Sequence, residues 1–275
     1  MGVFRRLSYR SGVMGLARSL HLTKLLRRIY YRCVTSSDGV VKLKMAGTEG
    51  KFYVRTPEEL RFFEAYFVLE KLFLQALIST LSPGDVFFDV GCNVGKLAIP
   101  VARVLGNAGR VIAFEPQEDF CSILETHLKL NGLRNVEVFK VALGEENKTA
   151  QLFVGGGACP SLLPHAQNGA KDAQASEAVE VVEGDWFRET HSLPVPRAVK
   201  IDVEGYEYSV LRGLKRTLAD PKCELLCLEI HPTLLPNGVR SDTLIDFVRL
   251  LGFRKIDSCA RVDEILVVAK KIPTD

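Results

Sequence analysis

The stretch that determines the fold class of this chain reads Asp85-Val86-Phe87-Phe88-Asp89-Val90-Gly91-Cys92-Asn93-Val94-Gly95. Its apolar part, Val86–Val90, predicts a short buried strand that runs into a tight loop, and a helix is expected directly afterwards over Lys96–Leu105. Glycines in such a loop let the backbone approach a ligand closely, and the free N–H groups of the helix start can bind a polar group. The stretch therefore predicts a small-molecule site at the end of a strand.

From Asp85 onwards, strands alternate with helices. The expected strands are Val86–Val90, Val111–Phe114, Val136–Val141, Val199–Val203, Leu225–Ile230, Phe253–Ile256 and Ile265–Ala269, and the further helices are Asp119–Leu130, Tyr208–Leu218 and Ser241–Leu251. Apolar strands separated by helices are typical of a parallel sheet that is covered on both faces. The link between the last two strands is too short for a parallel crossover, so the final strand should run antiparallel.

The residues at the strand ends indicate which ligand binds. Glu115 ends the second strand, 20 residues after Gly95, where an acid on an open α/β sheet can bind the hydroxyls of a ribose. Asn93 replaces the middle glycine of the dinucleotide-binding pattern, and the Asp89 carboxylate would repel a pyrophosphate. Asp89 suits a cationic ligand group instead. The combination favours S-adenosylmethionine as the cofactor.

Several blocks of the sequence together resemble the FkbM family of S-adenosylmethionine-dependent methyltransferases. They are Asp89–Gly95, Ala113-Phe114-Glu115-Pro116, Asn131–Val136, Lys200–Gly213 and Leu228-Glu229-Ile230-His231. The resemblance covers roughly residues 80–270. It implies a Rossmann-like class I methyltransferase fold, an α/β structure whose seven-stranded, mostly parallel sheet has an antiparallel final strand and helices on both faces. It also implies O-methylation of a hydroxyl on a small molecule, a sugar or glycan, or a carrier-bound intermediate.

The resemblance also implies which residues bind the cofactor. They are Asp89, Gly91, Cys92, Asn93, Gly95, Glu115, Pro116 and Ala142. The loop residues would line the methionine end, Glu115 would bind the ribose, and Pro116 and Ala142 would lie beside the adenine. Cys92 stands where the family more often has a small residue such as alanine, and we interpret it as a wall residue.

Three residues near strand ends are candidates for the base that removes the acceptor proton: Asp202, Glu204 and His231. Each also has a structural explanation, because Asp202 can contact the cofactor, Glu204 can cap a helix and His231 can be a loop residue. Lys200 lies inside an apolar strand and should pair with one of the carboxylates. Asp202, Glu229 and His231 carry possible metal-ligand atoms, but their spacing is not diagnostic, so we predict no metal site.

Charge is distributed unevenly along the chain. The 275 residues include 36 Lys and Arg against 33 Asp and Glu, yet residues 1–37 hold eight basic side chains and no acidic one. The remainder is slightly acidic, which excludes a bulk nucleic-acid binder, and we expect no nucleic acid as partner. We expect a basic helical arm over 1–37 with a helix at 16–33, a hairpin and helix over 38–84 that pack on the core, and the methyltransferase domain over 85–275. The hairpin is expected at Val40–Met45 and Lys51–Arg55, and a Thr56–Glu59 capping box should begin the helix after it.

The basic arm allows three interpretations. It can be an amphipathic helix on an anionic membrane, an Arg-rich organelle presequence, or a helix that packs on the core with solvated charges. Seven scattered cysteines without a Cys-x-x-Cys pair indicate reduced thiols. We therefore expect a cytoplasmic protein and consider peripheral membrane contact through residues 1–34. The oligomeric state is not predicted.

Two other function classes remain open at this point. One is an NAD(P)-dependent oxidoreductase on a similar sheet, and the other is a non-catalytic nucleoside-binding protein. No motif identifies the acceptor. The segment between Gly155 and Ser176 shows no hydrophobic period, and we expect it to be a lid or flexible insert that helps select the acceptor.

Overall fold

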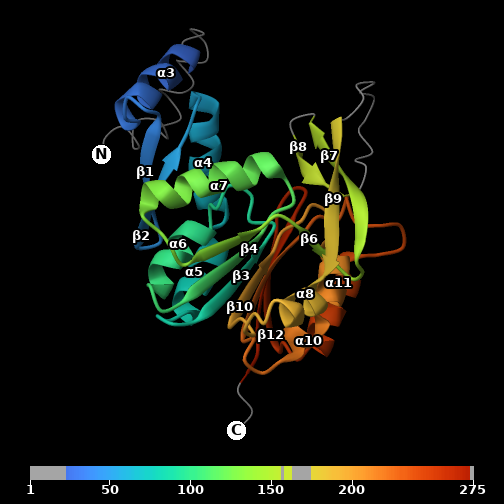
Figure 1. The fold of residues 1–275 in the computed structure, drawn as a ribbon. Coiled ribbons are helices and arrows are strands. Elements are labelled where there is room, and N and C mark those ends of the chain that lie inside the picture. Colours follow the sequence, from blue (N-terminus) through green and yellow to red (C-terminus); the bar gives the residue numbers. More distant parts are fainter. Residues whose placement is uncertain (1–22, 156–157, 163–174, 273–275) are drawn as a thin grey trace.

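The centre of the molecule is a seven-stranded sheet with the order β12-β13-β11-β10-β3-β4-β5. The computed structural model describes residues 23–155, 158–162 and 175–272 (Figure 1). The strands are β3 (Val86–Val90), β4 (Arg110–Phe114), β5 (Val136–Phe139), β10 (Ala198–Ile201), β11 (Leu225–Ile230), β12 (Lys255–Ala260) and β13 (Ile265–Lys270). Strands β11, β10, β3, β4 and β5 run parallel, and β13 is antiparallel to both of its neighbours. The predicted fold class is therefore confirmed.

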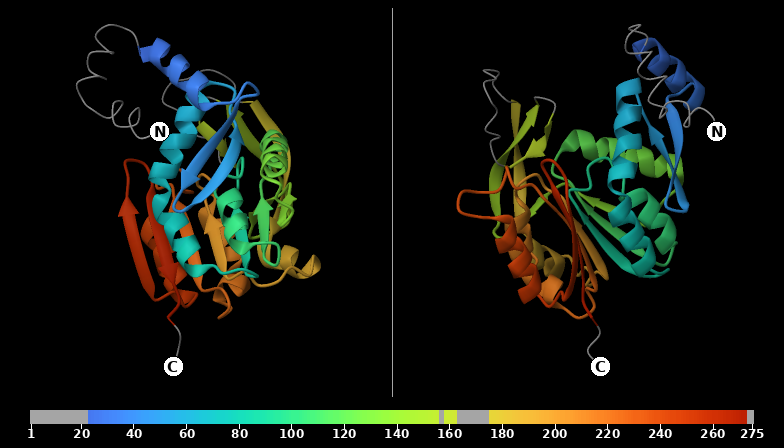
Figure 2. Two further views of the ribbon diagram at one scale, coloured as in Figure 1. Left: turned by 90° about the vertical axis from the view of Figure 1, so that its left-hand side faces the viewer. Right: turned by 180° about the vertical axis from the view of Figure 1, so that it is seen from behind.

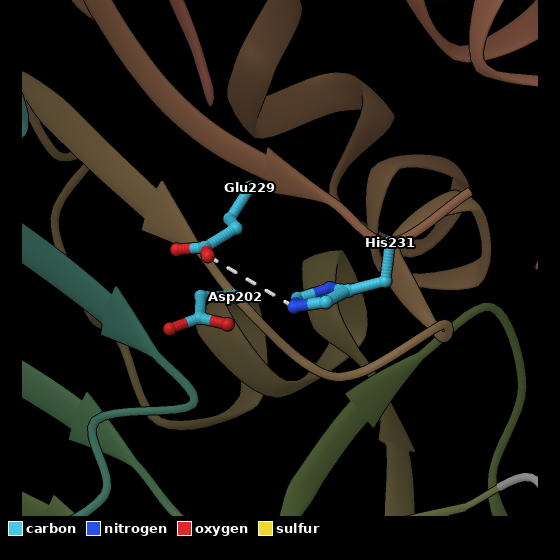
Figure 3. Close-up of side chains that lie close together, drawn as sticks. All are labelled: Asp202, Glu229 and His231. Carbon is cyan, nitrogen blue, oxygen red and sulfur yellow. Dashed lines mark ion pairs between the residues drawn. The ribbon is translucent and has the colours of Figure 1, made fainter. Parts of the chain in front are cut away.

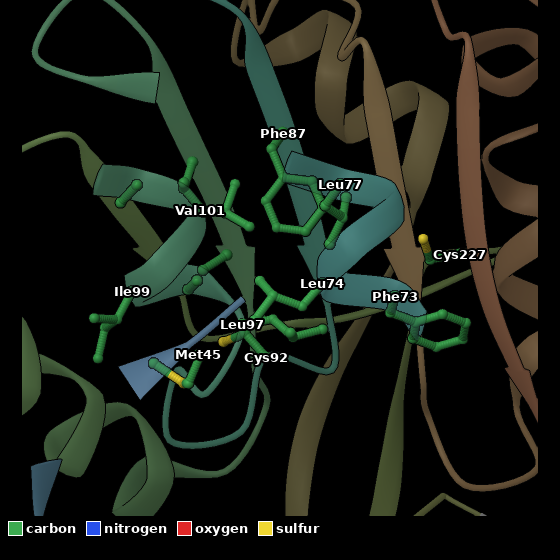
Figure 4. Packing of buried hydrophobic residues seen from close by; sticks show 14 of the residues in the cluster. Met45, Phe73, Leu74, Leu77, Phe87, Cys92, Leu97, Ile99, Val101 and Cys227 are labelled. Carbon is green, nitrogen blue, oxygen red and sulfur yellow. The ribbon is translucent and has the colours of Figure 1, made fainter. Parts of the chain in front are cut away.

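Helices cover both faces of this sheet, because successive strand residues point to opposite sides. Phe87 packs in the apolar cluster with α5 (Lys71–Thr80), α6 (Ala98–Leu105) and α7 (Glu118–Asn131), as part of Figure 4 shows. The next residue, Phe88, belongs to the cluster on the other face. The helices of that second face are α8 (Gly184–Thr190), α9 (Glu207–Gly213), α10 (Lys215–Ala219) and α11 (Ser241–Leu250). Both Phe87 and Phe88 are fully buried, so an apolar core lies on each face of the sheet.

The N-terminal elements pack against the side of the molecule that carries α5, α6 and α7. They are α3 (Thr23–Val34), β1 (Val40–Met45), β2 (Thr48–Tyr53) and α4 (Pro57–Leu69), and the predicted hairpin is present as β1 and β2. Phe52 of β2 is fully buried in the cluster that also holds Ile99 of α6. The part of the predicted helix 16–33 that precedes Thr23 lies outside the described residues. No described helix is both long and apolar enough to span a membrane.

The single helix expected after Thr56 is divided in two. It breaks at Glu70, which lies between α4 and α5 and is buried. The start of α4 has part of the predicted capping box: Thr56 Oγ1 accepts from Glu59 N at 3.1 Å, but Glu59 Oε2 accepts from Arg55 N, at 2.7 Å, rather than from Thr56 N. The helix expected over 208–218 is likewise divided, into α9 and α10.

A second sheet lies beyond the carboxyl ends of the main strands and was not predicted. Its strands are β6 (Ala142–Gly144), β7 (Lys148–Gly155), β8 (Ala158–Ser161) and β9 (Ala175–Glu183), in the order β6-β9-β7-β8. Figure 2 shows it at the same end of the molecule as α3 and α4. Strand β8 and the start of β9 fall inside the segment 155–176, for which the sequence predicted a lid or flexible insert and no strand. Strand β7 forms backbone hydrogen bonds with β8 and with β9. Such pairing can form strands in a segment that has no alternating hydrophobic pattern.

Candidate functional site

A pocket lies where β3, β4 and β10 end, enclosed on one side by Leu152 of β7 and Leu162. The predicted cofactor residues that line it are Asp89, Gly91, Cys92, Asn93, Glu115, Pro116 and Ala142. Asp202 and Glu204 line the same pocket. Gly95 and His231 are not among its lining residues, although His231 contacts Glu204. The fold therefore brings together most of the residues that the sequence singled out.

The glycines of the β3–α6 loop are favoured by their positive φ, and at Gly91 also by packing against the backbone. Gly91 has φ +73°, and a Cβ atom there would stand 1.9 Å from the carbonyl oxygen of Asp202. Gly95 has φ +82°, and its Cβ would meet Leu124 Cδ1 at 2.3 Å. Asn93 also has a positive φ, +51°. The loop is thus pressed between the end of β10 and helix α7, which fixes its shape before any ligand binds.

Asp89 and Lys200 form the floor of the pocket. Both side chains are almost fully buried, and Lys200 Nζ lies 3.4 Å from Asp89 Oδ1 and 3.3 Å from Asp202 Oδ2. These two contacts confirm the predicted pairing of Lys200 with a carboxylate, and its Nζ also donates to Gly91 O at 2.7 Å. The Lys200 ammonium is the ionic partner of the Asp89 carboxylate, and burial raises the pKa of Asp89. Beside this ion pair the carboxylate has lone pairs that can accept hydrogen bonds from a ligand ammonium group.

Glu115 is held in place by the backbone. Its Oε2 accepts from Asn93 N at 2.9 Å, and its Oε1 accepts from Gln117 N at 3.0 Å. Burial raises the pKa of Glu115 to about 7. Each oxygen keeps a further lone pair, so the carboxyl can still accept hydrogen bonds from ribose hydroxyls. Cys92 is buried nearby, and burial raises the pKa of its thiol well above the usual value, which suits a wall residue rather than a nucleophile.

A group of titratable side chains surrounds His231 beyond the ends of β10 and β11. His231 Nδ1 lies 2.7 Å from Glu207 Oε1, and Nε2 lies 3.5 Å from Glu204 Oε2. Burial alone would lower the pKa of His231, but the Glu207 hydrogen bond and the charges of Asp202 and Glu204 outweigh it and raise the pKa to about 9. His231 therefore carries a proton at neutral pH, which disfavours it as the resting base.

The two carboxylates beside His231 differ in setting. Burial would raise the pKa of Asp202, but Lys200 and His231 outweigh burial and hold it below the usual value. Glu204 stands at φ +49°, a left-handed conformation that is uncommon outside glycine, with its side chain about one-fifth exposed. Asp202 and Glu229 also come close to His231, as Figure 3 shows. Acids with different surroundings thus share one rim of the pocket.

Sequence reasoning missed five residues at or beside the site. Arg261 Nη1 pairs with Glu70 at 2.8 Å and with Glu264 at 3.2 Å, and all three line the pocket. Glu70 comes from the α4–α5 break, 191 positions before Arg261, so no local pattern joins them. Lys96 also lines the pocket, with its Nζ 3.8 Å from the ring centre of Phe62. Glu207 is the fifth. It lies in the family-like block 200–213, and its position two residues after Gly205 lets its carboxylate accept a hydrogen bond from Gly205 N.

The sheet order, the cofactor loop and the acidic residues at adjoining strand ends define a class I methyltransferase. Residues 89–255 match the family described as the methyltransferase FkbM domain. The chain therefore belongs to the FkbM methyltransferase family, as its sequence predicted. With the family come S-adenosylmethionine as the cofactor and methyl transfer as the class of reaction, and the oxidoreductase alternative is set aside.

The chain is also similar to individual proteins. Hexuronic acid methyltransferase AglP of Haloferax volcanii is 28% identical over 169 residues, which make up 60% of this chain and 64% of that protein. Ribosomal protein L11 methyltransferase of Caldanaerobacter subterraneus is 39% identical over 70 residues, or 26% of this chain and 22% of that protein. The structure of Aeropyrum pernix fibrillarin in complex with S-adenosyl-L-methionine is 16% identical, with a TM-score of 0.47, over 86% of this chain and 84% of that one. The match thus spans less than two thirds of either curated relative.

Proposed function

We propose that this protein transfers a methyl group from S-adenosylmethionine to an oxygen of a sugar acceptor that carries a carboxylate, such as a hexuronic acid in a glycan. The observation that carries the proposal is the shared pocket, in which the Asp89 carboxylate and the Glu115 carboxyl line the same space as Asp202 and Glu204. Similarity to the hexuronic acid methyltransferase of Haloferax volcanii supports the choice of acceptor.

The residues of the pocket fit the cofactor and leave room for separate tasks. Asp89 would hold the ammonium group and Glu115 the ribose hydroxyls. When bound, the cofactor supplies an electrophilic methyl group. The chain must then orient the acceptor oxygen and accept its proton. Glu204 suits the second task, because its carboxylate lines the pocket and is partly exposed. Lys200 and His231 hold the pKa of Asp202 below its usual value, and His231 carries a proton, so both are poorer bases.

The other side of the pocket supports an acidic sugar. Phe62 is 53% exposed and lines the pocket, so its ring can cover a sugar face. Lys96 lies beside that ring and is itself a pocket residue, so its ammonium can attract an acceptor carboxylate. An aromatic surface next to a cation is the chemistry that a hexuronic acid would require.

Binding and transfer experiments test the proposal in two stages. Calorimetry with S-adenosylhomocysteine and with NADH should show binding of the first alone, and binding of neither would favour a non-catalytic protein. Transfer of radioactive methyl groups to glucuronic and galacturonic acid glycosides should then exceed transfer to the matched glucose and galactose glycosides. Equal transfer to acidic and neutral sugars would remove the carboxylate from the acceptor requirement.

A further inference from the structure

The adjoining ends of β10 and β11 place three metal-ligand groups around one point. Ile201 lies opposite Leu228 in the parallel pairing, so Asp202 and Glu229 follow at the same level. His231 comes two residues after Glu229 and points to the same side, because strand side chains alternate. One ligand atom from each of the three residues lies within 4.8 Å of the others, and Figure 3 shows the side chains turned toward one another. The sequence spacing predicted no metal site, but given this convergence we propose that Asp202, Glu229 and His231 bind a divalent cation of the Mg²⁺ and Mn²⁺ class.

The orientation of His231 supports this site. A carboxylate can only accept a hydrogen bond, so the contact of 2.7 Å between Glu207 Oε1 and His231 Nδ1 makes Nδ1 the donor. That leaves Nε2 as the nitrogen that faces Glu229 and Glu204. A buried carboxylate that holds the distal N–H of an imidazole is the usual arrangement behind a histidine metal ligand. Glu207 is fully buried and is not one of the three proposed ligands. Its Oε1 accepts from Gly205 N and contacts His231 Nδ1.

The surroundings of Glu229 give a second reason. Its side chain is 7% exposed, and its Oε1 lies 3.9 Å from His231 Nε2. Glu229 lines the pocket together with the acids Asp202, Glu70 and Glu264, and the Arg261 guanidinium pairs with the last two of these. Buried carboxyl groups that face one another need a proton or a cation between them. A divalent ion would meet this need at the point where Asp202 and His231 also offer ligand atoms.

The ligand set indicates the kind of metal. Two carboxylates and one imidazole are oxygen-rich and lack thiolate, which suits Mg²⁺ or Mn²⁺ better than a soft ion. The cation would occupy the Nε2 lone pair in place of a proton. Since Asp202 and Glu229 line the pocket, the ion would lie where the acceptor oxygen has to bind and would favour its ionised form. This role rests on the proposed function, whereas cation binding itself does not.

Manganese binding to the full chain tests the site directly. After treatment with a chelator, the protein is titrated with Mn²⁺, and free Mn²⁺ is measured by electron paramagnetic resonance. We expect one site in the wild type and a loss of affinity of about tenfold or more in Glu207→Gln and in His231→Ala. His191→Ala is the control, because His191 is an exposed histidine at the end of α8, where its ring bonds to Phe187 O and packs on Phe139 and Phe187. Its affinity should equal that of the wild type.

The results separate the two proposals. Absence of a Mn²⁺ site in the wild type, or unchanged affinity in both His231→Ala and Glu207→Gln, would overturn the cation site. S-adenosylhomocysteine binding is measured in each variant, both to confirm folding and to test the cofactor pocket. Binding of Mn²⁺ without binding of S-adenosylhomocysteine would support the cation site and contradict the proposed function. Binding of S-adenosylhomocysteine without binding of Mn²⁺ would contradict the cation site and leave the proposed function standing.

Discussion

The Glu207 carboxylate lies 2.7 Å from Nδ1 of His231 and decides which ring nitrogen faces the pocket rim. The two residues come from different elements, since Glu207 begins α9 and His231 follows β11. Their contact joins the helix after β10 to the end of the neighbouring strand. One buried hydrogen bond therefore sets the orientation of the imidazole with respect to Asp202, Glu204 and Glu229.

This arrangement predicts a pH dependence of stability. The pKa of His231 is raised from an ordinary value of 6.5 to about 9. A raised pKa in the folded state means that the stabilisation is fully present below pH 6.5 and is lost as the pH rises through 9. The free energy of unfolding should therefore fall by up to about 3 kcal/mol over that interval. Urea titrations at pH 6 and pH 9.5 measure it, and the fall should be much smaller in His231→Gln; an equal fall in both proteins would assign the effect to other groups.

Removal of Glu115 should weaken cofactor binding. The side chain is fixed by Asn93 N and Gln117 N, so its remaining lone pairs are already aimed when the ligand arrives. Loss of hydrogen bonds to a charged group costs about 1.5–3 kcal/mol, which corresponds to a decrease of about tenfold or more in affinity. Calorimetry with S-adenosylhomocysteine should show this for Glu115→Ala, while Glu125→Ala, which removes an exposed acid on α7, should bind as the wild type does. Unchanged affinity in Glu115→Ala would remove this residue from the site.

Lys200 should be required for stability because two buried acids depend on it. In Lys200→Met, Asp89 and Asp202 would lose the ammonium that lies 3.4 and 3.3 Å from them. Breaking a buried pair from one side costs about 3–5 kcal/mol of unfolding free energy. Urea denaturation should show this loss, and the double variant Lys200→Met with Asp89→Asn should recover part of it. If the double variant were less stable than the single one by the full cost of Asp89→Asn alone, the two residues would not be coupled.

The sequence predicted the main sheet well because each strand carries its own signal. Val86–Val90 and Leu225–Ile230 are apolar except for one acid near the end of each, Asp89 and Glu229, and the structure has strands with those bounds. The second sheet was not predicted, because its strands are held by pairing between distant segments. Strand β7 pairs with β9, which lies on the other side of the segment 155–176. The same distinction holds at the site. Asp89 and Glu115 end predicted strands, whereas Glu70 reaches the pocket only because a helix breaks there and Arg261 lies across from it.

Gly91 should tolerate no side chain. The Cβ atom of Gly91→Ala would stand 1.9 Å from Asp202 O, a backbone atom that cannot move aside without displacing the end of β10. Gly132→Ala is the control, because Gly132 also has a positive φ, +64°, but nothing lies within 4 Å of its added Cβ. The control should lose about 1 kcal/mol from backbone strain alone, and Gly91→Ala should lose clearly more. Thermal denaturation compares them, and equal losses would mean that the contact with Asp202 yields easily.

The exposed face of α3 should bring the protein to anionic membranes. Three apolar side chains stand out from this helix: Leu25 is 54% exposed, Leu26 is 44% exposed and Ile29 is 46% exposed. The helix has no acid in its first turn, and basic residues lie between the apolar ones. Such a surface can insert apolar groups at the interface while its charges meet anionic headgroups. The full chain should float with phosphatidylserine vesicles, and less so in high salt.

A triple variant, Leu25→Ser, Leu26→Ser and Ile29→Ser, separates this surface from the other parts of residues 1–34. It keeps every basic residue, so a loss of flotation would assign the contact to the apolar face. The control replaces by serine two exposed apolar residues outside α3: Leu250, which is 83% exposed, and Val262, which is 97% exposed. This control should float as the wild type does. Equal flotation of the wild type and the triple variant would show that this face is not what holds the protein at the vesicle surface.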